Sequence, residues 1–262
     1  RTKLMITKGQ IMIKKTILIM FLVLFAGKLN AEVKTYKMVF VPASEKGDES
    51  DYTNLIAITE KLTGLNIDTI KVTDYNAAVE AMRAGRAHIA WYGGKTYVKA
   101  AEIANAEAFA AGVRPGEKDA GYYTYFVVKQ DSKLKEFKDV KAKTLSLNTI
   151  GSTSGDLIPQ VELNKINLSI KDKDHFKNVF YAGSHDACLL SVLNNQADVC
   201  GMSSRNFEAR LEDGTIALDD VRIIHKSDRV PPPPLAYSKL IPLEDRNKIK
   251  KAVLEAHNHG EI

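Results

Sequence analysis

The chain has 262 residues, of which 45% are hydrophobic and 26% are charged, and its formal net charge is +5. This length and composition allow a large hydrophobic core, in one domain or in two intertwined ones. Positions 1–31 hold six Lys and Arg residues and no Asp or Glu, so the rest of the chain carries a net charge of about −1. A nucleic-acid partner is not expected, because the excess of basic residues lies within positions 1–31 and the rest of the chain offers no such excess.

The N-terminal segment has the pattern of a secretory signal peptide. Met12 is the expected start, Lys14 and Lys15 form a basic head, and an apolar run covers 16–27. A run of about twelve residues is too short to span a bilayer, which needs ~20, so an uncleaved anchor is the weaker alternative. We expect cleavage after Ala31 and a periplasmic location. No cysteine follows the run, which argues against a lipoprotein anchor.

Two cysteines, Cys188 and Cys200, are the only ones in the chain. An exported protein can pair them in a disulfide. Two separate buried cysteines, acting as small apolar residues, are an equally good interpretation.

From residue 34 onward, strands and helices alternate along the chain. Strands are predicted at 38–41, 67–72, 87–90, 123–128, 143–147, 178–181, 197–200 and 221–224. Helices are predicted from about residue 51 to Gly64, over 76–83, after Gly94, over 156–163 and over 187–193. This alternation predicts an α/β fold with mostly parallel sheets flanked by helices.

Two such blocks predict two lobes that are joined by two crossings. We place the first lobe at 32–121 plus 231–262 and the second lobe at 122–230. The crossings are residues 122–126 and the proline run 231–234, in which fixed φ angles stiffen the chain. Polar loops follow the carboxyl ends of the strands, where open α/β sheets bind ligands, so a cleft between the lobes is the expected site.

The sharpest local motif is the hydroxyl-rich run Ser152, Thr153 and Ser154, which precedes a predicted helix. Unpaired N–H groups and a partial positive charge at a helix start suit a tetrahedral anion. Ordinary N-capping is the alternative, and for this motif taken alone it is the commoner use. His185 and Asp186 open another helix after Ser184, where His185 can donate to an anion oxygen or the segment can simply be a cap.

Aromatic residues follow two of the predicted strands. Tyr75 and Tyr92 each start a polar turn, where a phenol can donate to an oxyanion; for Trp91 we favour packing between the lobes. His257 with His259 lies at a ragged chain end, and His185 with Cys188 lacks a third metal ligand nearby in sequence, so no metal site is expected. No cofactor fingerprint and no pair of catalytic carboxylates is present, and we expect no cofactor.

Taken together and in order, these loops resemble the phosphonate-type (phosphate, phosphite, phosphonate) substrate-binding proteins of ABC transporters. The stretches that carry the resemblance are 72–75, 87–93, 151–155 with Pro159, 182–186 and 232–237. The resemblance implies a two-lobed periplasmic-binding protein type 2 fold that closes on its ligand. It also implies a monomer, no enzymatic activity and a membrane permease as partner.

By the same resemblance, Ser152, Thr153, Ser154 and His185 hold the phosphoryl oxygens, and Tyr75 and Tyr92 approach from the other lobe. Ser44 borders the cleft, and Asp186 accompanies His185. Relatives that bind aminoalkylphosphonates have a carboxylate after the strand at 197–200 and another near the second crossing. This chain has 202–205 (Met-Ser-Ser-Arg) and prolines there, so we expect discrimination against 2-aminoethylphosphonate.

Two other functions stay open at this point. The same module occurs as the input domain of membrane sensors, and we expect the chain to continue beyond Ile262, where a membrane helix would favour that role. An enzyme on a related fold is the weaker alternative, because the sequence offers no nucleophile paired with a base.

Overall fold

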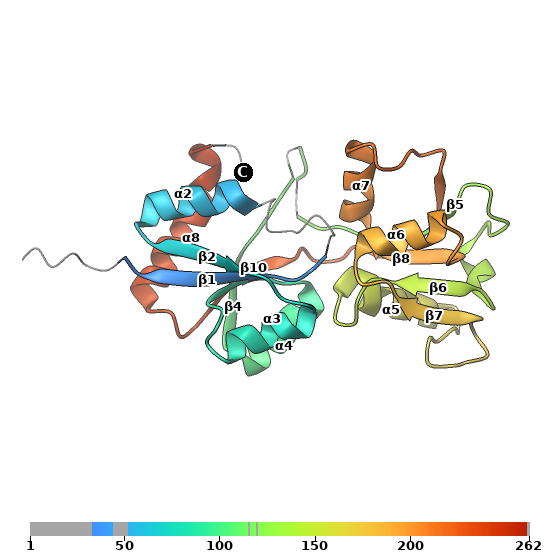
Figure 1. The fold of residues 1–262 in the computed structure, drawn as a ribbon, viewed down its shortest axis with the longest axis horizontal. Helices are drawn as coiled ribbons and strands as arrows, with labels where there is room; N and C mark the ends of the chain where they lie inside the picture. Colours follow the sequence, from blue (N-terminus) through green and yellow to red (C-terminus); the bar gives the residue numbers. More distant parts are fainter. Residues whose placement is uncertain (1–32, 44–51, 115, 119, 261–262) are drawn as a thin grey trace, which may run out of the picture. The chain divides into compact units, whose positions relative to one another are not determined.

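The computed structural model describes residues 33–43, 52–114, 116–118 and 120–260. Thr35–Ile262 form one compact unit, and its strands build two five-stranded sheets (Figure 1). The predicted signal peptide and its cleavage site, within residues 1–32, lie outside the described residues. Among the residues that are described, no helix is long and apolar enough to cross a membrane.

The first sheet, with its helices, is called lobe 1 here. Its strands, in spatial order, are β2 (Asn66–Ile70), β1 (Thr35–Phe40), β3 (Ile89–Trp91), β10 (Pro234–Ser238) and β4 (Ala106–Ala111). Its helices are α2 (Thr53–Thr63), α3 (Tyr75–Arg83), α4 (Gly94–Ile103), α8 (Leu243–Glu255) and the short η4 (Ala256–Asn258).

The second sheet, with its helices, is called lobe 2. Its strands, in spatial order, are β7 (Asn178–Tyr181), β6 (Thr144–Leu147), β8 (Val199–Ser203), β5 (Thr124–Lys129) and β9 (Val221–Lys226). Its helices are η2 (Phe137–Val140), the π-helical turn η3 (Thr153–Leu157), α5 (Ile158–Lys165), α6 (His185–Leu193) and α7 (Ser204–Glu212).

The α/β class is confirmed, but each sheet is mixed. In lobe 1, β1 pairs in parallel with β2 and β3, while β10 runs antiparallel to β3 and β4. In lobe 2, β6 pairs in parallel with β7 and β8, while β5 runs antiparallel to β8 and β9. The strands β5 and β10 are each the first strand after the chain passes from one sheet to the other. In the described chain, no crossover helix within the same sheet precedes them, and they can therefore run antiparallel to their neighbours. The exact lobe boundaries stay a prediction.

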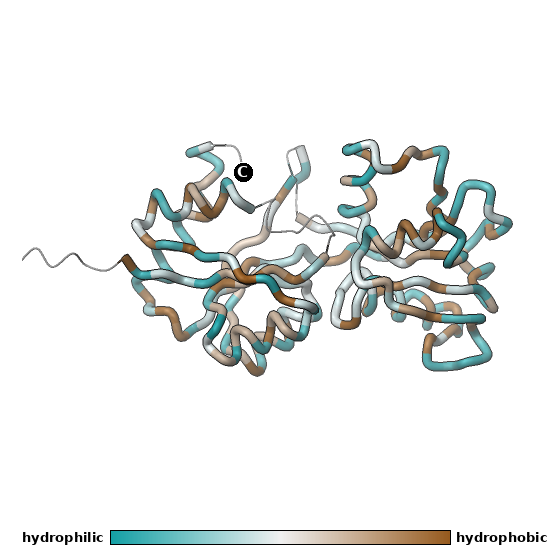
Figure 2. The backbone as a smooth tube through the Cα atoms, viewed as in Figure 1, coloured by the Kyte–Doolittle hydropathy of each residue, from teal (hydrophilic) through white to brown (hydrophobic). Residues whose placement is uncertain are grey.

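Alternation along the central strands buries both faces of each sheet. In β1, Tyr36, Met38 and Phe40 pack in one cluster, which includes Ile249 of α8. Val39 packs in the other cluster, with α3 and α4. Side chains on a strand point alternately to opposite faces, so α2 with α8 and α3 with α4 cover opposite faces of this sheet (Figure 1). Figure 2 shows hydrophobic and hydrophilic residues interspersed along the strands and helices of both lobes.

Several elements were not predicted from the sequence. The strand β4 is rich in alanine, which has a low strand propensity, and α7 and α8 are rich in charged residues. The predicted strand at 197–200 is instead β8, Val199–Ser203, two residues further on. Pro234, predicted to lie in a crossing, is the first residue of β10.

A disulfide joins Cys188 of α6 to Cys200 of β8, and their Cα atoms are 5.6 Å apart. The sequence left open a disulfide and two separate buried cysteines, and the structure confirms the disulfide. The bond fixes the helix that begins at His185 to the strand that ends at Ser203.

Candidate functional site

A cavity of about 630 Å³ is lined by residues of both lobes. Lobe 2 contributes polar groups to its wall, namely Ser152, Thr153, Ser154, His185, Ser203, Arg205, Asn206 and Arg210. Lobe 1 contributes mainly apolar and aromatic side chains, including Leu55, Tyr75, Trp91, Leu235 and Val253. The cavity therefore pairs a wall of hydrogen-bonding groups with a largely apolar one, as small-molecule sites commonly do.

The polar wall depends on residues 151–156, which follow β6 and include most of η3. This segment is called the 151–156 loop here. Gly151 has a φ of +101°, and a Cβ there would lie 3.0 Å from Cβ of Tyr75. At Gly155, a Cβ would lie 2.3 Å from Cβ of Asn148 and 2.8 Å from Cε1 of His185. Glycine is therefore required at both ends of the hydroxyl run. Gly151 is needed for its backbone conformation, and Gly155 is needed because a side chain would not fit there.

The hydroxyl groups of Ser152 and Thr153 accept hydrogen bonds from protein N–H groups. Ser152 Oγ accepts from Gly155 N at 3.1 Å, and Thr153 Oγ1 accepts from Lys95 N at 2.9 Å. A hydroxyl has one hydrogen to donate as well as lone pairs to accept with. With an N–H group already directed at the oxygen, the hydrogen of each hydroxyl can point to an acceptor in the cavity. Both side chains are almost completely buried.

His185 is arranged in the same way. Its Nδ1 accepts from Ser203 N at 3.2 Å, which leaves the hydrogen of the neutral ring on Nε2. Burial lowers the pKa of His185 to about 3, so the ring is neutral at ordinary pH. Ser184 caps the same helix by accepting from Ala187 N at 3.0 Å. The capping role thus falls to Ser184, and His185 is a neutral donor on the cavity wall.

Two tyrosines face the 151–156 loop. Tyr75, at the start of α3, is buried, and its hydroxyl lies 3.5 Å from Nδ2 of Asn148. Tyr122 precedes β5 and also lines the cavity. Burial raises the pKa of Tyr122, while the neighbouring hydroxyls of Ser154 and Thr153 act in the opposite direction. Tyr122 was not predicted as a site residue, although its place in a crossing between lobes was a usable signal.

Two other predicted residues, Tyr92 and Asp186, take different places. Tyr92 lies in the core of lobe 1, where its hydroxyl donates to Ala78 O at 3.3 Å, and it is not among the lining residues. Asp186 is also absent from the lining and lies 3.5 Å from Nε of Arg210. A carboxylate on the wall would repel an anion; Asp186 lies outside the lining and pairs with Arg210, which is part of it. Ser44 lies outside the described residues.

The charged groups on the described wall of the cavity are all basic. Arg114, Arg205 and Arg210 line it together with His257, and no Asp or Glu is among the described lining residues. Arg114 pairs with Glu208 at 2.8 Å, and Arg210 pairs with Asp213 at 2.9 Å. These pairs hold the Arg114 and Arg210 guanidinium groups in place, and the partner carboxylates lie outside the lining, so the wall itself presents guanidinium N–H donors. Trp91 lines the cavity too, and its ring lies 6.1 Å from that of Tyr52.

Within the described residues, no group of three or more His, Cys, Asp or Glu side chains is placed to hold a metal ion. The polar side chains that line the described wall include hydroxyls, the His185 and His257 rings, the Asn206 amide and guanidinium groups.

Comparison with known structures establishes the fold. A phosphonate ABC transporter binding protein from Pseudomonas aeruginosa matches with a TM-score of 0.75 at 24% identity, over 86% of this chain and 80% of that one. PhnD1 from Prochlorococcus marinus, solved with methylphosphonate, matches with a TM-score of 0.74 at 21% identity, over 85% of this chain and 83% of that one. The chain therefore has the two-lobed type 2 fold of periplasmic binding proteins, as predicted.

Sequence comparison leads to the same group of proteins. The phosphonates-binding periplasmic protein of Escherichia coli K12 is 29% identical over 212 residues, which are 79% of this chain and 61% of the relative. The phosphate-import protein PhnD of Mycolicibacterium smegmatis is 26% identical over 205 residues, which are 75% of this chain and 64% of the relative. The chain thus spans somewhat less than two thirds of the length of these curated relatives.

The family described as "ABC transporter, phosphonate, periplasmic substrate-binding protein" matches residues 38–261, which is most of the chain. The protein therefore belongs to the family of phosphonate-type periplasmic substrate-binding proteins of ABC transporters.

Proposed function

We propose that this protein captures a phosphorus oxyanion (a phosphonate, phosphite or phosphate) in the periplasm and delivers it to the membrane permease of an ABC transporter. The observation that carries the proposal is the orientation of the donors on the polar wall. Ser152, Thr153 and His185 each accept a backbone N–H, so that each can direct a hydrogen into the cavity. A small anion that carries only acceptors is the natural guest for such a wall.

The names of related proteins support this ligand class. Relatives are described as binding phosphonates, importing phosphate or binding phosphite. All of them are named as binding or import proteins, which supports a carrier that is not an enzyme. The predicted signal peptide at the N-terminus supports a periplasmic location.

Hydrogen bonds to a charged group are strong enough to account for useful affinity. Each contributes about 1.5–3 kcal/mol net. With Tyr75, Tyr122 and Ser154 added to the three donors above, about six bonds, less the cost of ordering and closure, correspond to affinities from about micromolar to nanomolar.

The same wall supports selectivity against 2-aminoethylphosphonate. An ammonium group needs a carboxylate partner when it is removed from water. The described lining has three arginines and no carboxylate. Phosphate, phosphite and small alkylphosphonates lack the ammonium group and avoid this cost.

Calorimetry on the purified protein tests the proposal with four ligands: methylphosphonate, phosphite, phosphate and 2-aminoethylphosphonate. We expect at least one of the first three to bind, and the fourth to bind at least about tenfold more weakly than the best of them. The substitution Thr153→Val keeps the side-chain shape and removes the hydroxyl, and should weaken binding about tenfold to a hundredfold.

The matched control is Thr59→Val in α2, a buried threonine that bonds Leu55 O and is not in the cavity lining. It should leave affinity within about twofold, because it removes a hydroxyl of the same type away from the ligand. Absence of binding to all phosphorus oxyanions would overturn the ligand class, and tight binding of 2-aminoethylphosphonate would overturn the selectivity.

A further inference from the structure

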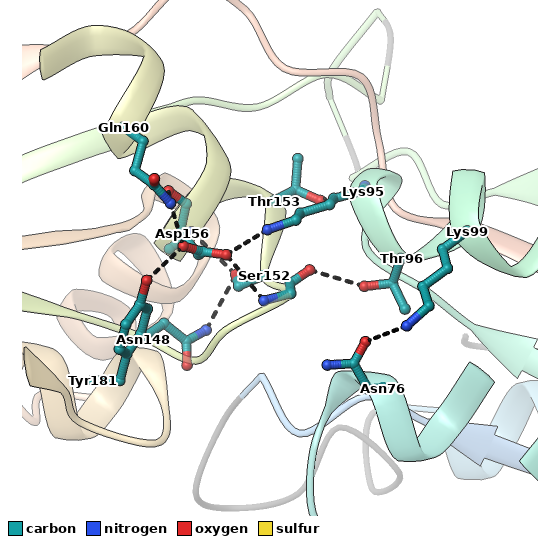
Figure 3. Close-up of polar contacts among 12 residues, drawn as sticks. Asn76, Lys95, Thr96, Lys99, Asn148, Ser152, Thr153, Asp156, Gln160 and Tyr181 are labelled. Atoms are coloured by element: carbon teal, nitrogen blue, oxygen red, sulfur yellow. Dashed lines mark hydrogen bonds and ion pairs between the residues drawn. The ribbon is translucent and has the colours of Figure 1, made fainter. Parts of the chain in front are cut away.

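An ion pair connects the two lobes beside the polar wall. Nζ of Lys95, in the first turn of α4, lies 2.6 Å from Oδ2 of Asp156 in the 151–156 loop (Figure 3). The Asp156 side chain is only 2% exposed, whereas that of Lys95 is 36% exposed. A buried carboxylate is unfavourable unless it is paired and hydrogen-bonded. The burial of Asp156 therefore depends on the groups that contact its carboxylate.

Asp156 is satisfied mainly from within lobe 2. Its carboxylate accepts from Gly151 N at 3.0 Å, from Tyr181 Oη at 2.8 Å and from Gln160 Nε2 at 2.6 Å. These bonds tie the first residue of the 151–156 loop to its last and anchor both to β7 and α5. Asp156 is therefore a positioning residue for Ser152 and Thr153, which lie between the two tied ends.

Lobe 1 reaches the same loop through the first turn of α4. Lys95 N donates to Thr153 Oγ1 at 2.9 Å, and Thr96 Oγ1 donates to Gly151 O at 2.9 Å. A Cβ at Gly93 would lie 3.0 Å from Thr153 Oγ1, so glycine at this position eases the close approach of the two segments. The charged contact of Lys95 is thus one of three polar contacts that join α4 to the loop, and all three require the lobes to be together.

We infer that Lys95 and Asp156 form a latch between the lobes, which holds the 151–156 loop against α4 and slows the release of the bound anion. The inference rests on the proposed function, because it assumes that an anion is held by this loop. Lys95 also offsets the charge of a buried carboxylate that lies close in sequence to the ligand-facing hydroxyls. Without Lys95, Asp156 would keep its lobe 2 donors but would repel an anionic guest.

Stopped-flow dissociation of the tightest-binding phosphorus oxyanion tests the latch. Lys95→Met should speed dissociation about tenfold to a hundredfold, since loss of one partner of a hydrogen-bonded charge pair acts mainly on the off-rate. Lys95→Arg, which keeps the charge, should stay within about threefold of wild type. Adding Asp156→Asn to Lys95→Met should recover part of the loss, because the unpaired charge is removed.

The matched control is Lys99→Met, one turn further along the same helix. Lys99 Nζ bonds Oδ1 of Asn76 at 2.9 Å, a contact within lobe 1 (Figure 3). This variant should release the ligand within about twofold of the wild-type rate. Wild-type release from a folded Lys95→Met protein, or strictly additive effects of Lys95→Met and Asp156→Asn, would overturn the latch.

Hydrogen exchange without ligand separates failure of the latch from failure of the proposed function. Lys95 N donates across the lobes, so peptides that cover 93–98 should exchange faster in Lys95→Met than in wild type or Lys99→Met. Equal exchange in all three proteins would overturn the latch, whatever ligand the protein binds. If the wild type binds no phosphorus oxyanion while exchange still responds to Lys95→Met, the proposed function fails and the contact between the lobes stands.

Discussion

At the scale of single residues, His185 shows how burial and one hydrogen bond decide a side chain's role. Its ring is almost completely buried, Nδ1 accepts from Ser203 N, and burial lowers its pKa to about 3. An imidazole in the unfolded chain has a pKa of about 6.5. At a pH between these two pKa values, the unfolded chain binds a proton at this residue and the folded protein does not. His185 therefore makes the free energy of unfolding decrease as the pH falls.

This difference predicts a pH dependence of stability. The free energy of unfolding should fall by about 2 kcal/mol between pH 7.5 and pH 5 through His185 alone. Urea titrations at several pH values measure this change. His185→Asn should give a shallower dependence, with a remainder because burial also lowers the pKa of His88. An identical slope in the variant would show that His185 is not neutral when folded.

At the scale of elements, the site depends on how α6 is attached to β8. His185 begins α6 and is held by Ser203, the last residue of β8. The disulfide between Cys188 and Cys200 joins the same two elements and closes a chain segment with a sequence separation of 12. The bond restricts the unfolded chain and at the same time fixes the helix that carries the neutral donor.

Removal of this disulfide should therefore be costly. The double substitution Cys188→Ala and Cys200→Ala should lower the free energy of unfolding by about 2–4 kcal/mol, since closing a segment of this length is worth about 3 kcal/mol. Chemical denaturation measures the change. Reducing agent should destabilise the wild type and leave the double variant unaffected; an unchanged midpoint for wild type with both thiols demonstrably reduced would contradict the prediction.

At the scale of the whole molecule, the cavity wall is shared between the two sheets. The 151–156 loop and His185 come from lobe 2, while Tyr75 and Trp91 come from lobe 1. Hydrogen bonds such as Lys95 N to Thr153 Oγ1 cross between them. A ligand that contacts both lobes stabilises the arrangement in which both are folded and together, by mass action.

Ligand binding should therefore stabilise the molecule as one unit. At a free ligand concentration of one hundred times Kd, the free energy of unfolding should rise by about 2.7 kcal/mol. For a chain of this size that is a rise in Tm of about 5–10 °C, which differential scanning calorimetry measures. The Thr153→Val variant at the same ligand concentration serves as the control and should shift less. Two separate transitions, of which only one responds to ligand, would contradict a shared site.

Much of the prediction rested on sequence patterns that extend over only a few residues. Strands with two buried faces, glycines after helices and the Ser-Thr-Ser run before a helix depend on residues close in sequence, so the α/β class and the 151–155 motif could be recognised without a structure. Tyr75 and Tyr92 look alike at this level, because each follows a strand. Only the packing of lobe 1 turns Tyr92 into the core, where its hydroxyl meets Ala78 O, and leaves Tyr75 on the cavity wall.

The sequence by itself determined the alternation of strands and helices over most of the chain, the fold class and the hydroxyl motif, because period-two burial, capping and glycine conformation act over a few residues. Only the tertiary structure decided that Cys188 meets Cys200, that Tyr122 reaches the wall and that Lys95 meets Asp156, two residues separated by 61 positions. Such contacts depend on how whole elements pack against one another, and no short stretch of sequence specifies which distant residues meet.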